Sequence, residues 1–430
     1  MKNFLSLLFL GSSALGHTLM LYATHYSGTV NKLEFDPDTR HLIITQSLKA
    51  CGKLPSWLTL DQDTNTLYCL DESGDVSSGT PGSLTAFHVA PNGDLAENAT
   101  VNTMPGGVHS TVYGKEKKYL AIANYGSSAI QTFALPFHDG SKPLQNITFG
   151  EGSKPHAVYV DPLTQSSLIV PDLGSDTIRV YGISGNNTGL LTKCPQLERV
   201  WEGRGPRHAA FTRDNLNNTM MYVANENSNT ILTFRLHHNG TTTSGPSDTG
   251  NKYTRSSIIR RNTIGTITHN LLCPSLEFVS EFENILGTTP VPKEGAYLGE
   301  IRAAENNRDL YVSLRGDKSF GGHDSIIQLQ AATANNTLNT VKRTLQSTSS
   351  TSPISYIRHS DSFGQFPRSF EISPDGTYVA IGNQASSNVA IVKRDPVYGH
   401  LGELVAWVPV GEPGDPKQGG GLSSVIWGKN

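Results

Sequence analysis

The sequence lacks a large excess of charge of either sign. Its 34 Lys and Arg residues nearly balance 37 Asp and Glu residues, which leaves a formal net charge of −3. Proteins that bind nucleic acid neutralise its phosphates with a strongly basic surface, and this composition does not provide one. We therefore expect no nucleic-acid partner. A long helical periodicity is also missing, so the pattern does not indicate a helical bundle.

Cysteine is scarce, with only Cys51, Cys69, Cys194 and Cys273 among 430 residues. No CxxC motif occurs, and no cysteine–histidine spacing fits a zinc site. We expect neither a metal nor a cofactor. Four cysteines allow three disulfide pairings, and proximity in the sequence favours Cys51 with Cys69 and Cys194 with Cys273.

Long hydrophobic runs are absent apart from residues 4–10, and this run is too short to span a bilayer as a mature anchor. Lys2 precedes the run, and small residues follow at Ala14 and Gly16. A short positive end, an apolar centre and a small-residue cleavage site are typical of a secretory signal. We expect a signal peptide over residues 1–16, cleavage after Gly16, a mature chain from His17 and no membrane span. The alternative is a buried first strand.

Sequons of the type Asn-x-Ser/Thr lie in polar, turn-like stretches, where a glycan is tolerated. Together with the N-terminal segment they indicate a secreted glycoprotein, extracellular or at the cell surface. The predicted glycosylation sites are Asn98, Asn146, Asn186, Asn217, Asn239 and Asn335.

The chain contains a repeated unit of strand, polar turn and strand. In one copy, residues 205–211 form a first strand that begins with Arg207 and His208, and residues 221–227 form a second strand that ends with Asn225 and Glu226. The sequence that follows a copy often predicts a third and a fourth strand. Four strands in roughly 40–50 residues is the period of a propeller blade. The other copies lie at residues 55–72, 108–125, 155–172, 300–315 and 367–384.

The two ends of the chain predict one composite blade. Residues 19–24 resemble a second strand without a first, and residues 421–427 resemble a first strand without a second. Pairing them makes seven blades and removes exposed sheet edges. The predicted fold is an all-β, seven-bladed β-propeller over residues 17–430, a single domain whose ring is closed by this composite blade. A long insertion is expected near residues 239–292.

The start of each first strand and the end of each second strand should meet at one mouth of the central channel. The first strand lines the channel from one face, and the antiparallel second strand returns to that same face. One predicted ring contains His109, His156, Arg207, His208, Arg302 and Arg368. The neighbouring ring contains Asn124, Asp172, Asn225, Glu226, Arg315, Asn383 and Gln384, joined by Thr24 and His25.

A funnel rich in arginine and histidine should bind a small anion, because the guanidinium fork holds carboxylate or phosphate oxygens in pairs. We expect the substrate to be a polycarboxylate or a sugar-acid lactone. The alternative is structural. A propeller histidine often only ties a loop to a strand, and Arg207 with Glu226 would then be an ion pair that neutralises the channel. The oligomeric state is left open.

Four short motif pairs recur in a fixed order: residues 154–157 with 171–174, 205–208 with 225–226, 300–302 with 311–316, and 366–368 with 382–384. As an ordered set they resemble the seven-bladed propeller lactonases, which include propeller-type 6-phosphogluconolactonases and carboxy-cis,cis-muconate cyclases. The resemblance covers nearly the whole mature chain. In the cyclase branch it implies catalytic residues at His156, Arg207, Glu226 and Arg302. Substrate binding is assigned to His109, Asp172, His208, Arg315, Arg368 and Gln384.

The predicted reaction is the interconversion of an unsaturated polycarboxylate and its lactone by a carboxymuconate cyclase-like enzyme. His156 or Glu226 would transfer the proton, while Arg207 and Arg302 would hold carboxylates and stabilise enolate charge. A lactone hydrolase, such as a 6-phosphogluconolactonase, would use the same base to activate water and the same arginines to bind a phosphate or carboxylate. The residues do not separate these two reactions.

Two further classes remain open. One is a non-catalytic secreted surface glycoprotein on a propeller scaffold. The other is a metal-dependent lactonase that uses Asn124, Asp172 and Glu226 as oxygen ligands. The nearby arginines count against it, because a divalent cation wants several oxygen ligands and few neighbouring cations.

Expression through a eukaryotic secretory pathway should release a chain that begins at His17 and carries N-linked glycans. Mass spectrometry of the N-terminal peptide identifies the first residue, and endoglycosidase treatment should increase the mobility of the protein on a gel. Replacing Asn98 and Asn186 by Gln should reproduce part of that increase. A secreted chain that still begins at Met1 and ignores the glycosidase would contradict the prediction.

Overall fold

The computed structural model describes residues 18–195, 198–214, 216–238, 273–292, 294–332 and 353–429. The predicted signal peptide, its cleavage site, and the sequons at Asn239 and Asn335 lie outside these residues. So does the stretch 239–272, which is most of the predicted insertion. No helix within the described ranges has the length and apolar character needed to cross a membrane.

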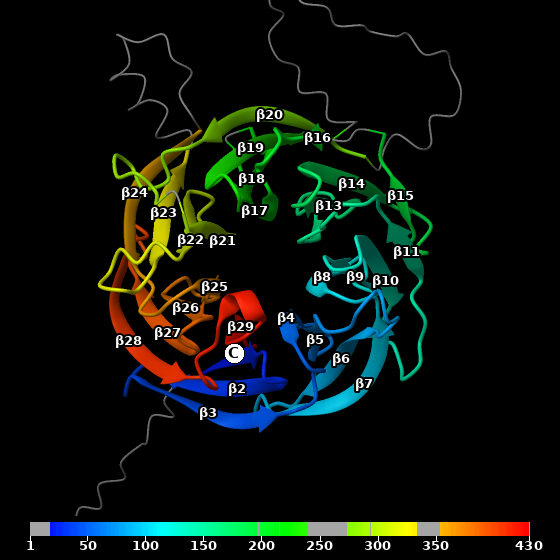
Figure 1. Ribbon diagram of the computed structural model, residues 1–430, viewed down its shortest axis with the longest axis horizontal. Helices are drawn as coiled ribbons and strands as arrows, with labels where there is room; N and C mark the ends of the chain where they lie inside the picture. The colour runs from blue at the N-terminus through cyan, green and yellow to red at the C-terminus, as the bar shows by residue number, and fades with distance from the viewer. Residues whose placement is uncertain are drawn as a thin grey trace, which may run out of the picture.

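Seven antiparallel sheets surround a central axis and form a β-propeller (Figure 1). The first sheet consists of β29 (Leu422–Trp427), β1 (Leu19–His25), β2 (Thr29–Asp36) and β3 (His41–Leu48). The second consists of β4 (Pro55–Asp61), β5 (Thr66–Asp71), β6 (Gly82–Val89) and β7 (Leu95–Thr103). The third consists of β8 (Gly107–Tyr113), β9 (Tyr119–Asn124), β10 (Ala129–Ala134) and β11 (Gln145–Thr148).

The fourth sheet has a divided outer edge. It consists of β12 (Tyr159–Val160), β13 (Ser167–Asp172) and β14 (Thr177–Ile183), and β14 pairs with both β15 (Leu191–Lys193) and β16 (Glu198–Arg199). The fifth consists of β17 (Pro206–Arg213), β18 (Thr219–Asn225), β19 (Thr230–His237) and β20 (Ser275–Phe282). The sixth consists of β21 (Tyr297–Ala303), β22 (Asp309–Arg315), β23 (Ser325–Ala331) and β24 (Ile354–Asp361).

The seventh sheet consists of β25 (Pro367–Ile372), β26 (Tyr378–Asn383), β27 (Asn388–Arg394) and β28 (Leu401–Pro409). A short 3₁₀ helix, η1 (Pro416–Gln418), lies between β28 and β29. The predicted all-β, seven-bladed fold is confirmed. The composite blade is confirmed as well, because β29 pairs with β1 and places Ile426 opposite Tyr22.

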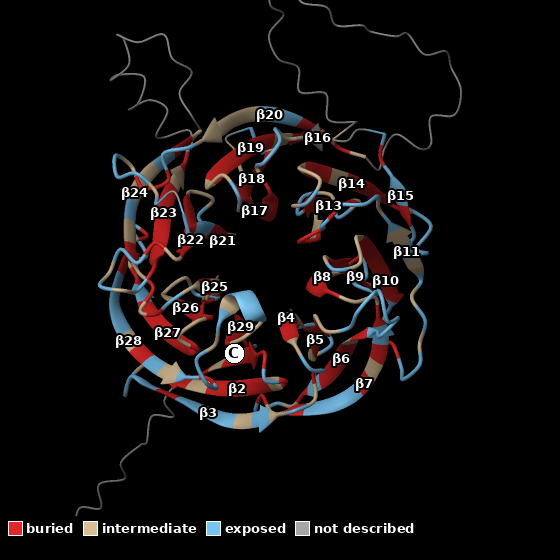
Figure 2. Cartoon of the chain, viewed as in Figure 1, coloured by how far each residue is buried: buried red, intermediate tan, exposed pale blue. Residues whose placement is uncertain are grey.

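The core lies between the blades. Each middle strand is covered by a neighbouring blade on both faces, so β18 is buried at every position. Its Tyr222 packs toward the sixth blade, while Val223 packs toward the fourth. The outermost strands face solvent on one side, and β3 and β7 accordingly contain many exposed residues (Figure 2).

Both predicted disulfides are present, Cys51–Cys69 and Cys194–Cys273. The second bond ties the outer edge of the fourth blade to the segment that leads into β20. The insertion predicted over residues 239–292 extends too far toward the C-terminus. Residues 275–282 are not inserted material, because they form the fourth strand of the fifth blade and pair with β19.

Polar residues that end several second strands hold the loops at the channel mouth. Asp172 is fully buried, and its carboxylate accepts hydrogen bonds from Ser153, from the Lys154 N–H at 2.7 Å and from Arg179 Nε at 2.8 Å. Asp71 accepts the Leu54 N–H at 2.8 Å in the same way. Asp172 was expected to bind substrate, but its oxygens are occupied by the protein, since the strand end turns this side chain toward the loop backbone.

Replacing Asp172 by Ala should lower the free energy of unfolding by about 3–5 kcal/mol, because the change leaves the partly buried Arg179 without its partner. Chemical denaturation measures the loss. Asp63, whose ion pair with Lys117 is exposed, provides the control: Asp63→Ala should change the free energy of unfolding only slightly. Equal, small losses for both variants would show that Asp172 does not hold the loop.

Candidate active site

A β-bulge near the start of the first strand directs one side chain of a blade toward the channel mouth. In β17, Pro206 pairs with Asn225 and His208 with Ala224, so Arg207 is the inserted residue. A bulge disrupts the ladder locally and re-aims a side chain. Corresponding shifts occur in β8 at Val108 and in β25 at Arg368.

A second ring at the mouth comes from the ends of the second strands. In six blades it is the residue just after the strand, and in the sixth blade it is Arg315, the last residue of β22. All seven residues line one cavity. They are Tyr26, Glu72, Tyr125, Leu173, Glu226, Arg315 and Gln384.

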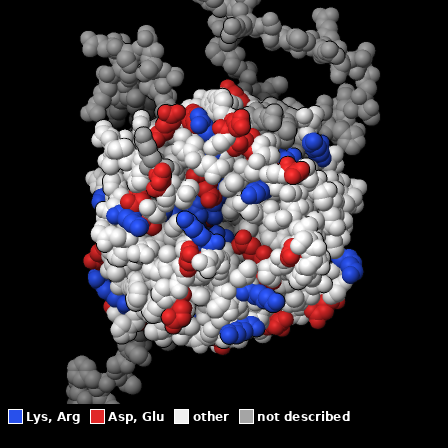
Figure 3. Space-filling view, viewed as in Figure 1, with Lys and Arg blue, Asp and Glu red and all other residues white. Residues whose placement is uncertain are grey.

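This mouth cavity has a volume of about 1030 Å³, and Val108, His156, Arg207 and Arg368 complete its inner wall. Figure 3 shows basic side chains gathered at the centre of this face, with acidic side chains around them. The volume is at the upper end of the range for small-molecule sites. The predicted meeting of first-strand starts and second-strand ends at one mouth is therefore confirmed for these residues.

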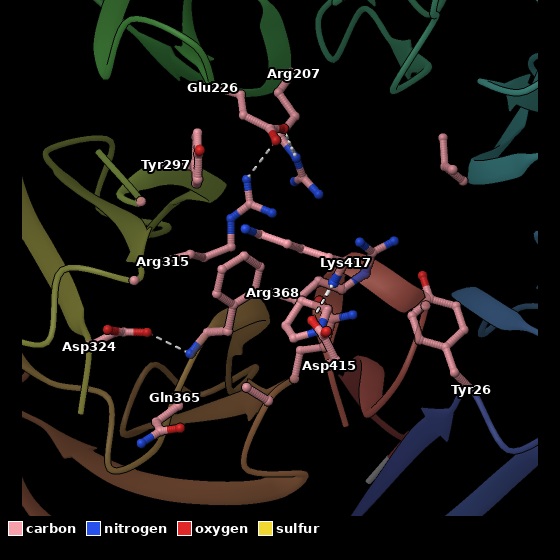
Figure 4. Close-up of a pocket in the computed structure, with 18 of the residues that line it drawn as sticks. Tyr26, Arg207, Glu226, Tyr297, Arg315, Asp324, Gln365, Arg368, Asp415 and Lys417 are labelled. Carbon is pink, nitrogen blue, oxygen red and sulfur yellow. Dashed lines mark hydrogen bonds and ion pairs between the residues drawn. The ribbon is translucent and has the colours of Figure 1, made fainter. Parts of the chain in front are cut away.

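Glu226 is shared between two arginines. Its Oε2 lies 2.8 Å from Arg207 Nε, and its Oε1 lies 3.1 Å from Arg315 Nη2 (Figure 4). The Arg207 side chain is only 2% exposed. A second group lies beside this pair: the Tyr26 hydroxyl donates to Glu72 at 2.6 Å, and Arg368 Nη2 lies 3.6 Å from the same carboxylate oxygen.

The charges of this group persist at neutral pH. Burial alone would raise the pKa of Glu226, but Arg315 and Arg207 outweigh it and hold that pKa below its ordinary value. Burial, followed by repulsion from Arg315, lowers the pKa of Arg207 to about 10. Glu226 is therefore a carboxylate with little tendency to accept a proton, and its geometry suits it to fix the two guanidinium groups.

His156 lies in the same cavity wall as a neutral imidazole. Burial, followed by the charge of Arg207, lowers its pKa well below the ordinary value. Its ring packs against Tyr125 and His208, with centroids 5.6 and 5.1 Å away. Its Nδ1 is buried and forms no hydrogen bond within the described part of the chain. His156 is therefore unprotonated at physiological pH, and this is the form in which a ring nitrogen can act as an acceptor.

Three of the predicted mouth residues lie deeper in the channel. His109 stacks on Trp57 with centroids 4.2 Å apart, and His208 Nδ1 lies 3.2 Å from Glu300. Arg302 Nε donates to the Phe370 carbonyl at 3.3 Å. None of the three lines the mouth cavity. The bulge explains the positions of His109 and His208, because each directly follows the inserted residue of its strand. Arg302 instead lies after the irregular part of β21 and pairs with Tyr311.

Arg302 lines a separate cavity of about 360 Å³ together with Glu371. Of the ten predicted catalytic and substrate-binding residues, the structure brings six together at the mouth: His156, Arg207, Glu226, Arg315, Arg368 and Gln384. The oxygen ligands of the metal-dependent alternative do not converge. Asp172 is held by its loop, Asn124 Nδ2 donates to Gln131, and Glu226 is bound by arginines.

Tyr26, Glu72 and Tyr125 were not predicted as site residues, although they line the cavity. Each occupies the position in its blade that Glu226 occupies in the fifth. Aligning the blades on the last residue of the second strand would have found them. Lys417 and Asp415 were also missed, because η1 belongs to no repeat.

The fold and the site together define a class of protein: a seven-bladed propeller whose channel mouth gathers arginines around one carboxylate beside a neutral histidine. The chain belongs to the family described as "Lactonase, 7-bladed beta-propeller", whose model matches residues 20–257 and 275–417.

Curated relatives are distant but cover most of the chain. A probable 6-phosphogluconolactonase of Arthroderma benhamiae is 24% identical over 70% of this chain and 67% of its own length. A 6-phosphogluconolactonase of Bacillus subtilis is 23% identical over 90% of this chain and 96% of its own.

Solved structures share the fold. A periplasmic gluconolactonase of Pseudomonas aeruginosa superposes with a TM-score of 0.68 at 19% identity, covering 95% of this chain and 99% of that one. A putative 6-phosphogluconolactonase of Bacteroides fragilis superposes with a TM-score of 0.67 at 19% identity, covering 97% and 99%.

Acid should destabilise the propeller through its buried histidines. Burial is the main cause that lowers the pKa values of His109, His156 and His208 well below the ordinary value. Below about pH 6.5 the unfolded chain therefore binds more protons than the folded chain. The contribution of these histidines to the free energy of unfolding is fully present above that pH. It falls as the pH decreases, by about 2 kcal/mol per histidine at pH 5.

Replacing His109 by Phe keeps a ring against Trp57 and removes one of these groups. The loss of unfolding free energy between pH 7.5 and pH 5 should then shrink by about 2 kcal/mol. Denaturant titrations at both pH values measure the difference. An unchanged pH dependence would mean that His109 has the same pKa in the folded protein as in the unfolded chain.

Proposed function

We propose that the protein hydrolyses the lactone of a sugar acid, with 6-phosphogluconolactone as the first candidate substrate. The observation that carries this proposal is the arrangement of Arg207, Glu226 and Arg315 beside the neutral His156 in one cavity. Membership of the lactonase family and the names of the curated relatives support it.

In the proposed reaction a water oxygen attacks the lactone carbonyl carbon while His156 accepts a proton from that water. Negative charge develops on the carbonyl oxygen, where Arg207 and Arg315 stabilise it. The ring C–O bond then breaks, and the leaving alkoxide takes the proton from the imidazolium of His156. The products are a free hydroxyl and a carboxylic acid, which ionises at neutral pH.

Glu226 has a positioning role in this scheme. Its pKa is held low by Arg315 and Arg207 against the effect of burial, so it stays a carboxylate bound to the two guanidinium groups. Each of its oxygens holds one guanidinium group. An arginine fixed in this way loses less conformational entropy when it binds an anion.

The cyclase reaction lacks specific support, since no relative described above is named as a cyclase. A cyclase would use the same arginines to bind substrate carboxylates, so carboxymuconate belongs in the assay as an alternative substrate. Action outside the cytoplasm is also part of the proposal, supported by the N-terminal segment and by the neighbour that is named periplasmic.

Purified protein should hydrolyse 6-phosphogluconolactone, measured by acid release in a weakly buffered indicator assay. His156→Gln should lower kcat by about 10²–10⁴-fold, because it removes the proton acceptor. Arg207→Ala should lower kcat/KM by about 10²–10³-fold through loss of oxyanion stabilisation. Glu226→Gln should raise KM and lower kcat less than either change.

The exposed His41 provides a matched control, and His41→Gln should keep full activity. Circular dichroism verifies that each variant keeps the propeller fold. Carboxymuconate, followed by ultraviolet loss of its diene, tests the cyclase. A protein that turns over none of these compounds, or a His156→Gln variant as active as the wild type, would refute the enzyme proposal.

A further inference from the structure

The segment between β28 and β29, residues 410–421, crosses the channel mouth near the composite blade (Figure 1). We call it the C-terminal strap. It contains η1 and five glycines, at positions 411, 414, 419, 420 and 421. Asp415, Pro416, Lys417 and Gly419 of the strap line the mouth cavity.

The strap is fixed to the propeller at both ends. His25 Nε2 lies 2.9 Å from the Glu412 carbonyl, and the Gly414 N–H donates to Ala385 at 3.1 Å. Gln384 Nε2 donates to the Gly420 carbonyl at 3.0 Å. At Gly421, φ is 90° and a Cβ would lie 1.9 Å from the Gln384 carbonyl oxygen, so only glycine fits this close approach. The strap therefore holds its side chains in set positions over the mouth.

Lys417 is the basic residue of the strap, and its ammonium group is unpaired. The Asp415 carboxylate caps η1, accepting the Lys417 N–H at 2.9 Å and Gln418 Nε2 at 3.2 Å. Lys417 Nζ forms no ion pair or hydrogen bond with any residue that the structure describes. Figure 4 shows the side chain pointing toward Arg315 across the cavity.

Lys417 is exposed to solvent at the mouth, so its ammonium group is free to meet an anion that enters the cavity. Arg207 and Arg315 already share Glu226, and Arg368 lies near Glu72, whereas Lys417 has no such partner among the described residues. Lysine is a compact point charge that suits phosphate, while the arginine fork suits a planar carboxyl group. The two kinds of cation therefore match two different parts of one ligand.

We propose that Lys417 determines specificity by binding a charged group, such as a phosphate, on the substrate carbon chain away from the lactone carbonyl. This inference rests on the proposed lactone hydrolysis at the same site. The carbonyl faces His156, Arg207 and Arg315, and the charged substituent reaches back beneath the strap. A cavity of about 1030 Å³ has room for both parts.

Steady-state kinetics with two lactones test the inference. Lys417→Met should raise KM for 6-phosphogluconolactone about 10-fold or more, because a hydrogen bond to a charged group is lost. For the uncharged gluconolactone, KM should change less than about twofold, and kcat should stay within about twofold for both. Lys417→Arg should restore much of the affinity.

Variants at two other lysines test whether the effect is specific to Lys417. Lys393→Met, at the exposed position of the otherwise buried β27, controls for net charge and should leave both KM values unchanged. Lys318 also lines the mouth cavity. If Lys318→Met raised KM for the phosphorylated lactone as much as Lys417→Met, discrimination would come from the general charge of the mouth, and the assignment to Lys417 would be wrong.

Calorimetric binding of the two product anions separates this inference from the reaction itself. Wild type should bind 6-phosphogluconate more tightly than gluconate, and Lys417→Met should remove most of that preference even if no lactone is hydrolysed. Hydrolysis of both lactones with no effect of Lys417→Met would refute the specificity role and keep the proposed function. Equal binding of both anions by wild type, or binding of neither, would also refute it.

Discussion

The pairing of β29 with β1 is the constraint on which the rest of the structure depends. It joins the last strand to the first and completes the four-stranded blade that closes the described ring. The mouth cavity takes one second-strand residue from each of the seven blades, so its shape is defined only when the ring is closed. The same closure carries the C-terminal strap across the mouth. Stability, site geometry and access to the site therefore share one structural cause.

Electrostatic imbalance at the mouth is the second organising feature. Burying cations is costly unless carboxylates compensate them, and here Glu226 serves both Arg207 and Arg315. Repulsion within the cluster contributes to the lowered pKa of Arg207. A bound anion would relieve that repulsion, and this incomplete compensation is the physical basis of the anion binding that we propose. The neutral state of His156 has a related origin, because burial and the same cations disfavour its protonation.

Some site residues were predictable from sequence because their positions follow from local rules. The repeated strand–turn–strand pattern fixes which residues begin a first strand and which end a second, and it correctly placed Arg207, Glu226 and Arg315 at one mouth. The pattern did not show that Arg207 faces the mouth while His208 lies deeper in the channel. That difference depends on the bulge in β17, which arises from pairing with β18 and changes the side-chain alternation by one residue.

The sequence by itself determined the all-β class, the number of blades and the composite closure, because period and turn residues are local properties. Among the three possible disulfide pairings it only favoured the one that forms. Only the tertiary structure decided which polar residues face the cavity. Asp172 is the last residue of β13 and turns toward loop backbone, whereas Glu226 follows the last residue of β18 and faces the mouth. It also decided the place of Lys417, which belongs to no repeat and reaches the site only because closing the ring carries the strap over it.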